Sequence, residues 1–299
     1  MSKQQKAIFL DVYNDFLEYT KKRSKKQSYD TLVTDFNKHI LPYFLDKDIR
    51  KLTKVDIINW QSIILDFNYS NNFNRKLYYT FSKFIEYCIL YSYLKENIVT
   101  QVGQFPKKNK ITEYVVYNRL QFWWFRFNLK DYVLKQYFTF IYYYGTRPGE
   151  AMALKFTDNK GLRLRIIHNL QRKGKRELDT PKNKSSIRGF KISLICKFRF
   201  WKLKRYYLKK YGTFNSDYFI FGGIKPLAPT TIDRYKKAAY EKAKLPSITQ
   251  HEFRHSYATR KIHKGVAIDK VSRSMGHSQV YTTVNTYLHQ EKNTFKVFP

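Results

Sequence analysis

The chain has 299 residues, 43% of them hydrophobic and 27% charged, which is typical of a folded globular protein. Lys and Arg number 57 against 23 Asp and Glu, a formal net charge of +34, so we expect a polyanionic partner such as nucleic acid or an anionic membrane surface. Only two cysteines are present and no apolar run reaches the roughly 18 residues of a membrane span, which excludes a disulfide framework, a Cys-ligated zinc module and a transmembrane protein. We expect a cytoplasmic protein.

The first third of the chain has the apolar periodicity of helices only. It predicts helices over residues 7–20, 28–43, 54–66 and 71–91. In the last of these, Leu77, Phe81, Phe84 and Cys88 form one apolar stripe, and Thr53 is placed to cap the third helix. We therefore expect an all-helical domain over residues 1–103, followed by a polar, Pro-containing linker over residues 104–112.

Residues 113–299 have a mixed pattern. A buried helix is predicted over residues 131–144, and the alternation of apolar and charged residues that begins Leu-Arg-Leu-Arg predicts a strand over 162–168. Two further short strands are expected on either side of residues 181–184. Helices are then predicted over residues 194–211, 229–243, 250–263 and 268–275, and near 279–287. The predicted fold class is mainly α with a small antiparallel β-sheet, divided into two domains.

One motif indicates a chemistry that its surroundings do not support. Residues 251–255 (HEFRH) match the His-Glu-x-x-His pattern of zinc proteases. Ala258 and Lys261 stand where the extended zinc-protease pattern has a Gly and a third His ligand, and no Glu follows before Glu291. His251 and Arg254 lie on one helix face instead, where an Arg fork can bind two phosphate oxygens while a His moves a proton. We therefore expect a phosphodiester site without metal or cofactor.

Residues 144–150 (YGTRPGE) predict a second phosphate site. Pro148 suits the first position of a helix, and Glu150 would lie in its first turn. Arg147 would then stand at a helix N-terminus, where free backbone N–H groups attract anions. Taken by itself, the segment favours an ordinary helix cap beside an exposed arginine.

Four segments together resemble the tyrosine recombinases, the phage integrase family. They are residues 145–150 (GTRPGE), 251–259 (HEFRHSYAT), 275–278 (MGHS) and 282–289 (TTVNTYLH), in the order that the family has. The resemblance implies a SAM-like core-binding domain followed by an α+β catalytic domain. Few residues precede the first predicted helix, so we expect no arm-binding domain.

The resemblance implies a role for each matching residue. Arg147 and Arg254 would hold the scissile phosphate, and Tyr287 would attack it to leave a 3′-phosphotyrosine. His251 would take the proton of the tyrosine. Tyr281, six residues earlier, is expected to be structural.

The family also places a lysine in a turn between two strands, as general acid for the leaving 5′-oxygen. Residues 180–188 (TPKNKSSIR) resemble that turn, and Lys182 is our candidate, with Lys184 and Lys175 as rivals. His277 would donate a hydrogen bond to a phosphate oxygen, and Glu150 would support the site.

These inferences predict a site-specific DNA recombinase or integrase of a mobile element that needs no nucleotide. Its expected partners are double-stranded DNA and three further copies of the chain, as a homotetramer on paired sites, with an accessory directionality factor as a further candidate. Two alternatives stay open on the sequence alone. One is a nicking-closing enzyme like type IB topoisomerases, and the other is a non-catalytic DNA-binding protein.

Overall fold

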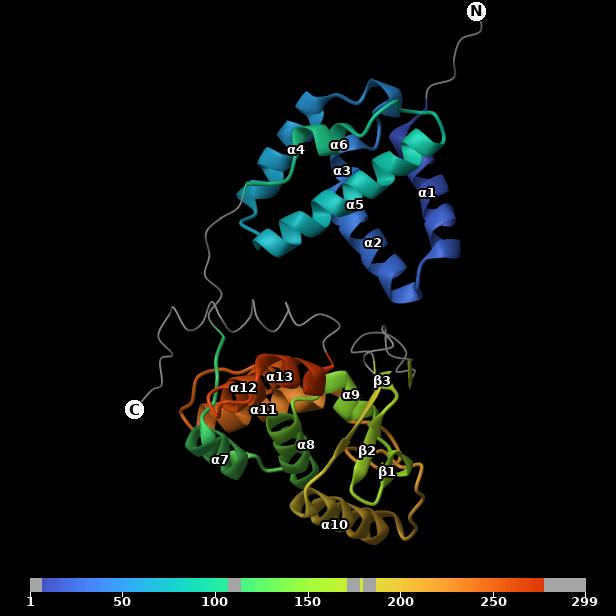
Figure 1. The fold of residues 1–299 in the computed structure, drawn as a ribbon. Coiled ribbons are helices and arrows are strands. Elements are labelled where there is room, and N and C mark those ends of the chain that lie inside the picture. The colour runs from blue at the N-terminus through green and yellow to red at the C-terminus, as the bar shows by residue number, and fades with distance from the viewer. Residues whose placement is uncertain (1–6, 107–113, 171–177, 180–186, 277–299) are drawn as a thin grey trace, which may run out of the picture. The chain divides into compact units, whose positions relative to one another are not determined.

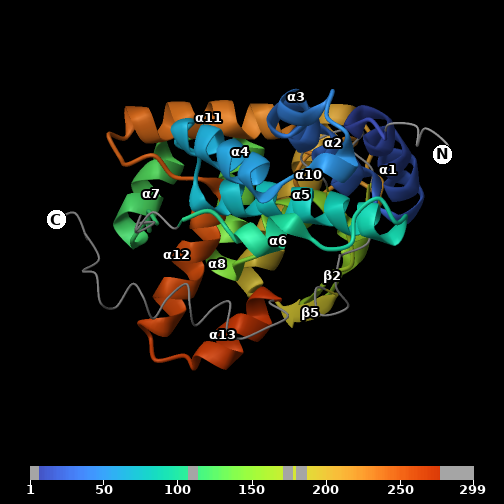
Figure 2. The same cartoon turned by 90° about the horizontal axis from the view of Figure 1, so that it is seen from above.

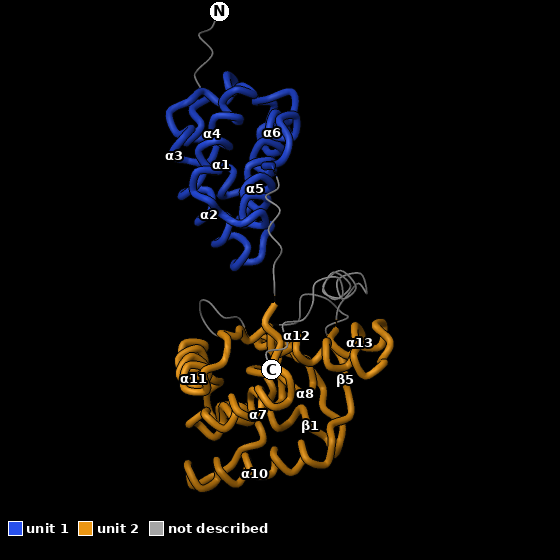
Figure 3. The backbone as a smooth tube through the Cα atoms, turned by 90° about the vertical axis from the view of Figure 1, so that its left-hand side faces the viewer, with its two compact units in different colours: residues 1–111 blue, residues 112–299 orange. Residues whose placement is uncertain are grey.

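The structure, a computed structural model, describes residues 7–106, 114–170, 178–179 and 187–276. The chain divides into two compact units, residues 1–111 and 112–299, shown in different colours in Figure 3. The predicted linker over residues 104–112 includes Phe105, which is buried in unit 1 with its ring 5.4 Å from that of Trp60. None of the helices in the described ranges is long and apolar enough to cross a membrane.

Unit 1 is helical in all its described regular elements. They are α1 (Phe9–Arg23), α2 (Lys26–His39), α3 (Leu41–Phe44), the 3-10 turn η1 (Ile49–Lys51), α4 (Lys54–Asp66), α5 (Asn71–Leu90) and α6 (Ile98–Val102). Thr53 caps α4 as predicted, because its side chain accepts from the backbone of Asp56 while the Asp56 carboxylate accepts from the backbone of Thr53. The predicted helix over 28–43 is wrong in one respect, because it is interrupted at Ile40. Pro42 is not tolerated in the interior of a helix, and it lies instead in the first turn of the separate helix α3.

The core of unit 1 is aromatic, and α5 passes through it. Helix α5 packs against α1, α2 and α6, as Figures 1 and 2 show from two directions. Its buried Phe81 and Phe84 meet Phe9 and Phe36 from α1 and α2, at ring-centroid distances of 4.9 to 6.3 Å. The apolar stripe read from the sequence of α5 is therefore its core-facing side.

Unit 2 combines helices with short strands. Its helices are α7 (Arg119–Asn128), α8 (Tyr132–Tyr144), α9 (Pro148–Ala153), the 3-10 turn η2 (Phe156–Asp158), α10 (Leu194–Tyr211), α11 (Pro229–Lys242), α12 (Gln250–Ile262) and α13 (Ile268–Met275). Its strands are β1 (Asn159–Lys160), β2 (Arg163–Ile166), β3 (Asn169–Leu170), β4 (Leu178–Asp179) and β5 (Arg188–Lys191). The predicted fold class is confirmed, whereas α7 was not predicted and the predicted helix near 279–287 lies outside the described residues.

The strands form two small antiparallel sheets rather than one. β2 is the centre of the sheet β1-β2-β5, and β3 pairs with β4 in a separate two-stranded sheet. Leu164 and Ile166 of β2 are buried while Arg163 and Arg165 are exposed, which is the predicted alternation. The pairing places Arg188 of β5 directly opposite Ile166. The strands expected around residues 181–184 correspond to β4 and β5, which belong to different sheets.

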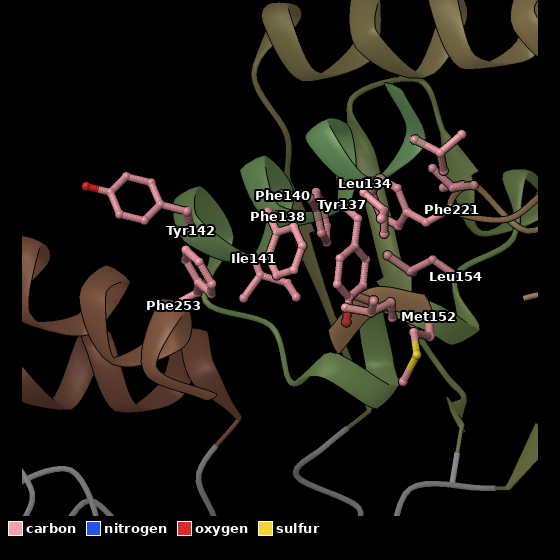
Figure 4. Close-up of a cluster of buried hydrophobic side chains, with 14 of the residues drawn as sticks. Leu134, Tyr137, Phe138, Phe140, Ile141, Tyr142, Met152, Leu154, Phe221 and Phe253 are labelled. Atoms are coloured by element: carbon pink, nitrogen blue, oxygen red, sulfur yellow. The ribbon is translucent and has the colours of Figure 1, made fainter. Parts of the chain in front are cut away.

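Helix α8 is the centre of unit 2. Nearly its whole circumference is buried, and it packs against α7, α9, α10 and α12. Figure 4 shows its apolar side chains, among them Tyr137, Phe138 and Ile141, meeting Phe253 of α12 and Phe221. The helix ends at Gly145, whose φ of +63° is the left-handed conformation common at helix C-termini. The core of unit 2 therefore fixes the position of the segment after Gly145, which carries Arg147.

We expect Gly145→Ala to destabilise the protein more than Gly212→Ala does. Both glycines end helices with a left-handed φ, which costs an alanine about 1–2 kcal/mol. A Cβ at Gly145 would also lie 2.3 Å from the ring of Tyr257, whereas nothing lies within 4 Å of one at Gly212. Urea unfolding should show an additional loss of about 1–3 kcal/mol for Gly145→Ala. Equal losses would contradict this account of the α8 terminus.

Candidate active site

Arg254 is a buried cation in the first half of α12. The start of α12 is fixed by a capping box, in which the Thr249 hydroxyl accepts from the Glu252 backbone at 3.2 Å and the Glu252 carboxylate accepts from the Thr249 backbone at 2.6 Å. The side chain of Arg254 donates from Nη1 to the Gly145 carbonyl at 2.9 Å and from Nη2 to the Met275 carbonyl at 2.8 Å. The guanidinium is therefore held in one orientation by the ends of two other helices.

Arg147 stands immediately before α9, with Pro148 at the first helical position as predicted. Its backbone N–H donates to Glu150 Oε2 at 2.9 Å, and its Nη1 donates to Glu150 Oε1 at 2.8 Å. Its Nη2 donates to the Gly276 carbonyl at 2.9 Å. The interpretation of Arg147 as an isolated surface arginine at a helix cap is therefore wrong, because the side chain is part of a fixed network.

Arg188 is a third arginine in this network, and the sequence analysis did not single it out. It lies on β5, and its Nη1 and Nη2 donate to the two carboxylate oxygens of Glu150 at 3.1 and 2.8 Å. Its Nε donates to the Ser274 carbonyl at 3.1 Å. In the sequence, Arg188 is marked only by its position at the end of the segment 180–188, which resembles the lysine-bearing turn. That position alone does not distinguish it among 57 basic residues.

Glu150 is ionised at the centre of these arginines. Only 2% of the residue is exposed, and this burial raises the pKa of its carboxyl. The hydrogen bond from Arg188 and the charges of Arg188, Arg254 and Arg147 outweigh burial, so the pKa lies below its ordinary value. Three guanidinium groups against one carboxylate leave the site with a net positive charge, which suits an anionic substrate.

The three arginines converge on the last turn of α13. Arg188 reaches the Ser274 carbonyl, Arg254 that of Met275, and Arg147 that of Gly276. Carbonyl groups at a helix C-terminus lack helical partners and carry partial negative charge, so they are good acceptors for guanidinium groups. The residues that immediately precede His277 are thus hydrogen-bonded to arginines of the segments 145–150 and 251–259.

The His-Glu-x-x-His segment is used differently from a zinc site. Glu252, the residue that would be the catalytic base of a zinc protease, accepts from the backbone N–H groups of Thr249 and Val115. His255 stacks on Tyr114 at 4.6 Å, and burial, followed by the charges of Arg254 and His251, lowers the pKa of His255 to about 4. His251 is exposed in the first turn of α12, one turn before Arg254. The segment is therefore a capped helix that presents His251 and Arg254.

Three of the predicted site residues are placed together and a fourth lies nearby in the chain. Arg147, Glu150 and Arg254 belong to one network, and His251 is on the same helix as Arg254. The remaining candidates lie outside the described residues; they are Lys182, His277 and Tyr287, together with the rivals Lys175 and Lys184 and the tyrosine regarded as structural, Tyr281. Across the described ranges, no group of three or more His, Cys, Asp or Glu is arranged to hold a metal.

Comparison with known proteins identifies the class of this fold and site. Residues 126–294 match the phage integrase family, and residues 8–65 match the N-terminal SAM-like domain of phage integrases. The ICEBs1 integrase of Bacillus subtilis (strain 168) is 27% identical over 98% of this chain and 82% of its own length. A XerC-like tyrosine recombinase of Caldanaerobacter subterraneus is 33% identical over 54% of this chain and 46% of its own length.

Solved structures share the fold. The integrase of the transposon Tn1549, in complex with a circular intermediate DNA, has a TM-score of 0.72 at 15% identity and covers 96% of this chain and 100% of its own. A lambda integrase dimer bound to a core site has a TM-score of 0.76 at 14% identity, covering 98% and 81%. The chain belongs to the phage integrase family. It is a site-specific DNA recombinase of the integrase type, which confirms the predicted function class.

We expect Arg188→Met to cost about 3–5 kcal/mol of unfolding free energy, because it leaves the buried Glu150 with one arginine fewer. Arg273→Met is the matched control. It breaks an arginine–carboxylate pair with Asp269 that is exposed at the surface, where such pairs contribute about 0–1 kcal/mol. Chemical unfolding at pH 7 measures both losses. A change below about 1 kcal/mol for Arg188→Met would show that the Glu150 network does not stabilise the fold.

The network should also make stability depend on acid pH. The pKa of Glu150 is lower in the folded chain than its ordinary value of 4.5, so its stabilising effect is present above pH 4.5 and is lost as pH falls through the folded pKa. We expect Glu150→Gln to be less stable than the wild type at pH 7 and the difference to shrink as the pH falls below 4.5. Urea titrations at pH 7, 5, 4 and 3 test this. A difference independent of pH would mean that Glu150 is not an ionised partner of the arginines.

Proposed function

We propose that this recombinase cuts and rejoins DNA strands through a covalent 3′-phosphotyrosine at Tyr287, as part of the integration and excision of a mobile element. The observation that carries the proposal is the convergence of Arg147 and Arg254 at the C-terminus of α13, with Arg147 tied to a buried, ionised Glu150. The two arginines hold the scissile phosphate. Attack on phosphorus forms a pentacoordinate state with additional negative charge, which oriented guanidinium forks stabilise.

Proton movements accompany both halves of the reaction. A tyrosine has a pKa of about 10, so only about one in a thousand is ionised at pH 7 and a base must take its proton. His251 takes the proton of Tyr287, and the new bond joins the tyrosine oxygen to phosphorus. The bond to the 5′-oxygen breaks, and Lys182 protonates that leaving group. His277 donates to a phosphate oxygen. Attack by a 5′-hydroxyl on the phosphotyrosine reverses the steps, so no external energy source is required.

We also propose a domain arrangement and an assembly, which the similarity to solved integrases supports. Residues 1–103 form the core-binding domain and residues 113–299 the catalytic domain, and both bind double-stranded DNA. A solved lambda integrase is a tetramer bound to a Holliday junction, which supports a homotetramer on paired sites for this chain. An accessory directionality factor is a further partner, and the cytoplasm is the proposed compartment.

Tyr287→Phe should abolish the covalent intermediate. The change removes one oxygen and keeps the ring, so DNA binding should stay within about twofold of the wild type while cleavage falls to background. The substrate is a nicked duplex that carries the terminal sequence of the mobile element in which the gene lies. Cleavage near the nick releases a short fragment, so the strand cannot be rejoined and the protein–DNA adduct accumulates for gel analysis. The DNA-linked peptide is then mapped by mass spectrometry.

Tyr281→Phe is the matched control and should form the adduct as the wild type does. An adduct that maps to Tyr281, or that persists in Tyr287→Phe, would overturn the assignment of the nucleophile. Cleavage should also be complete in EDTA, and activity that is lost there and restored by zinc would instead support a metal site at His251 and His255. Relaxation of supercoiled DNA without strand exchange between two duplexes would indicate a nicking-closing enzyme.

A further inference from the structure

Helix α10 presents an outward face that is strongly basic and has no role in the site described above. Its eighteen residues include no Asp or Glu. Its exposed cations are Lys197, Lys202, Lys204, Arg205, Lys209 and Lys210. Within the described residues, no ion pair neutralises any of them. These like charges repel one another in the free protein. Arg205 lies one helical turn from Lys202 and one turn from Lys209, and each such pair destabilises the helix by a few tenths of a kcal/mol.

Aromatic rings lie between these cations. Phe198 and Trp201 are about half exposed and stack on one another, with ring centroids 5.6 Å apart. Lys202 Nζ lies 4.8 Å from the centre of the Phe198 ring, and Arg205 Cζ lies 4.9 Å from the centre of the Trp201 ring. Cations interleaved with exposed aromatic rings are the pattern of surfaces that bind nucleic acid, where phosphates meet the cations and bases or sugars meet the rings.

This face is on the other side of unit 2 from the arginine network. Figures 1 and 3, drawn from directions 90° apart, both place α10 at the end of unit 2 opposite α13, whose last turn binds Arg147, Arg188 and Arg254. The buried side of α10 faces the core through Cys196, Phe200, Leu203 and Tyr207. A DNA segment held at the arginine network therefore leaves the α10 face available for another segment.

We propose that the outward face of α10 is a second DNA-binding surface, independent of sequence and separate from the catalytic face. From Lys197 to Lys210 the helix spans about 20 Å at 1.5 Å per residue. B-DNA carries one charge per about 1.7 Å of axis, counted over both strands, so that length offers on the order of ten phosphates, and those on the near side of the duplex can meet the cations of the outward face. The chemistry recognised is the phosphate backbone. It holds a second stretch of DNA while strands are exchanged at the first.

Lysine footprinting tests the surface directly and does not depend on cleavage. The full chain is acetylated with and without DNA of arbitrary sequence, as a 20-base-pair duplex in one experiment and as a single strand in the other, and the modified lysines are mapped by mass spectrometry. Lys197, Lys202, Lys204 and Lys209 should be modified at least threefold more slowly when DNA is bound. If the duplex protects these lysines more strongly than the single strand does, duplex DNA is the preferred ligand, and the reverse result indicates single-stranded DNA. Unchanged modification of all four with both would overturn the proposal and leave the face to an acidic protein partner.

A matched pair of variants supplies a second measurement. The first replaces Lys197, Lys202, Lys204 and Lys209 by Gln. The control replaces by Gln four exposed lysines of unit 2 that lie outside α10, namely Lys130, Lys160, Lys225 and Lys242, so both variants lower the net charge equally. Each phosphate contact contributes about 0.9 to the slope of log affinity against log salt for duplex DNA. With protein and an arbitrary duplex at near-equal concentrations, the α10 variant should fail to bridge two differently labelled duplexes. Its slope should fall by about 3.6, which is four contacts at about 0.9 each. Bridging as strong as in the wild type, or equal loss in both variants, would overturn the proposal.

Discussion

The buried carboxylate of Glu150 is the interaction on which the catalytic unit depends. A carboxylate this far from water is tolerable only with charged partners, and here it receives hydrogen bonds from Arg147 and Arg188 and lies in the field of Arg254. Its partners come from the start of α9 and from strand β5, so one ionised group joins a helix to the sheet. Three guanidinium groups act on this one carboxylate, so the site keeps a net positive charge and can bind an anion although it contains one.

The packing of α8 and α12 places these charges. Phe253, the neighbour of Arg254 in α12, is fully buried against α7 and α8, while Arg254 itself reaches the carbonyl of Gly145 at the end of α8. Arg147 and Arg254, more than a hundred residues apart in the chain, therefore meet because two core helices pack together. Stability and geometry are coupled here: a cavity in this core would move the arginines as well as weaken the fold.

Local patterns predicted the elements well and the tertiary network only in part. Helices such as α4, α10 and α13 begin and end where caps and periodicity indicated, because those signals are local. Helix α7 was missed, although Asn118 and Gln121 form a capping box that marks its start, because its exposed face is as aromatic as its buried one. The sequence resemblance indicated Arg147, Glu150 and Arg254, yet the contact of Arg188 with Glu150 joins residues 38 apart and has no local pattern.

The basic residues of unit 2 divide into two physical kinds. The arginines of the network are held by carbonyl and carboxylate acceptors, so they lose little further freedom when a phosphate arrives and can specify its position. Within the described residues the lysines of α10 have no carbonyl or carboxylate partner, so a phosphate bound there gains affinity from counterion release rather than geometry. Strand exchange uses both kinds of contact. The reacting phosphate must be positioned accurately with respect to the arginines, whereas the flanking DNA or the partner duplex needs only to stay bound close by.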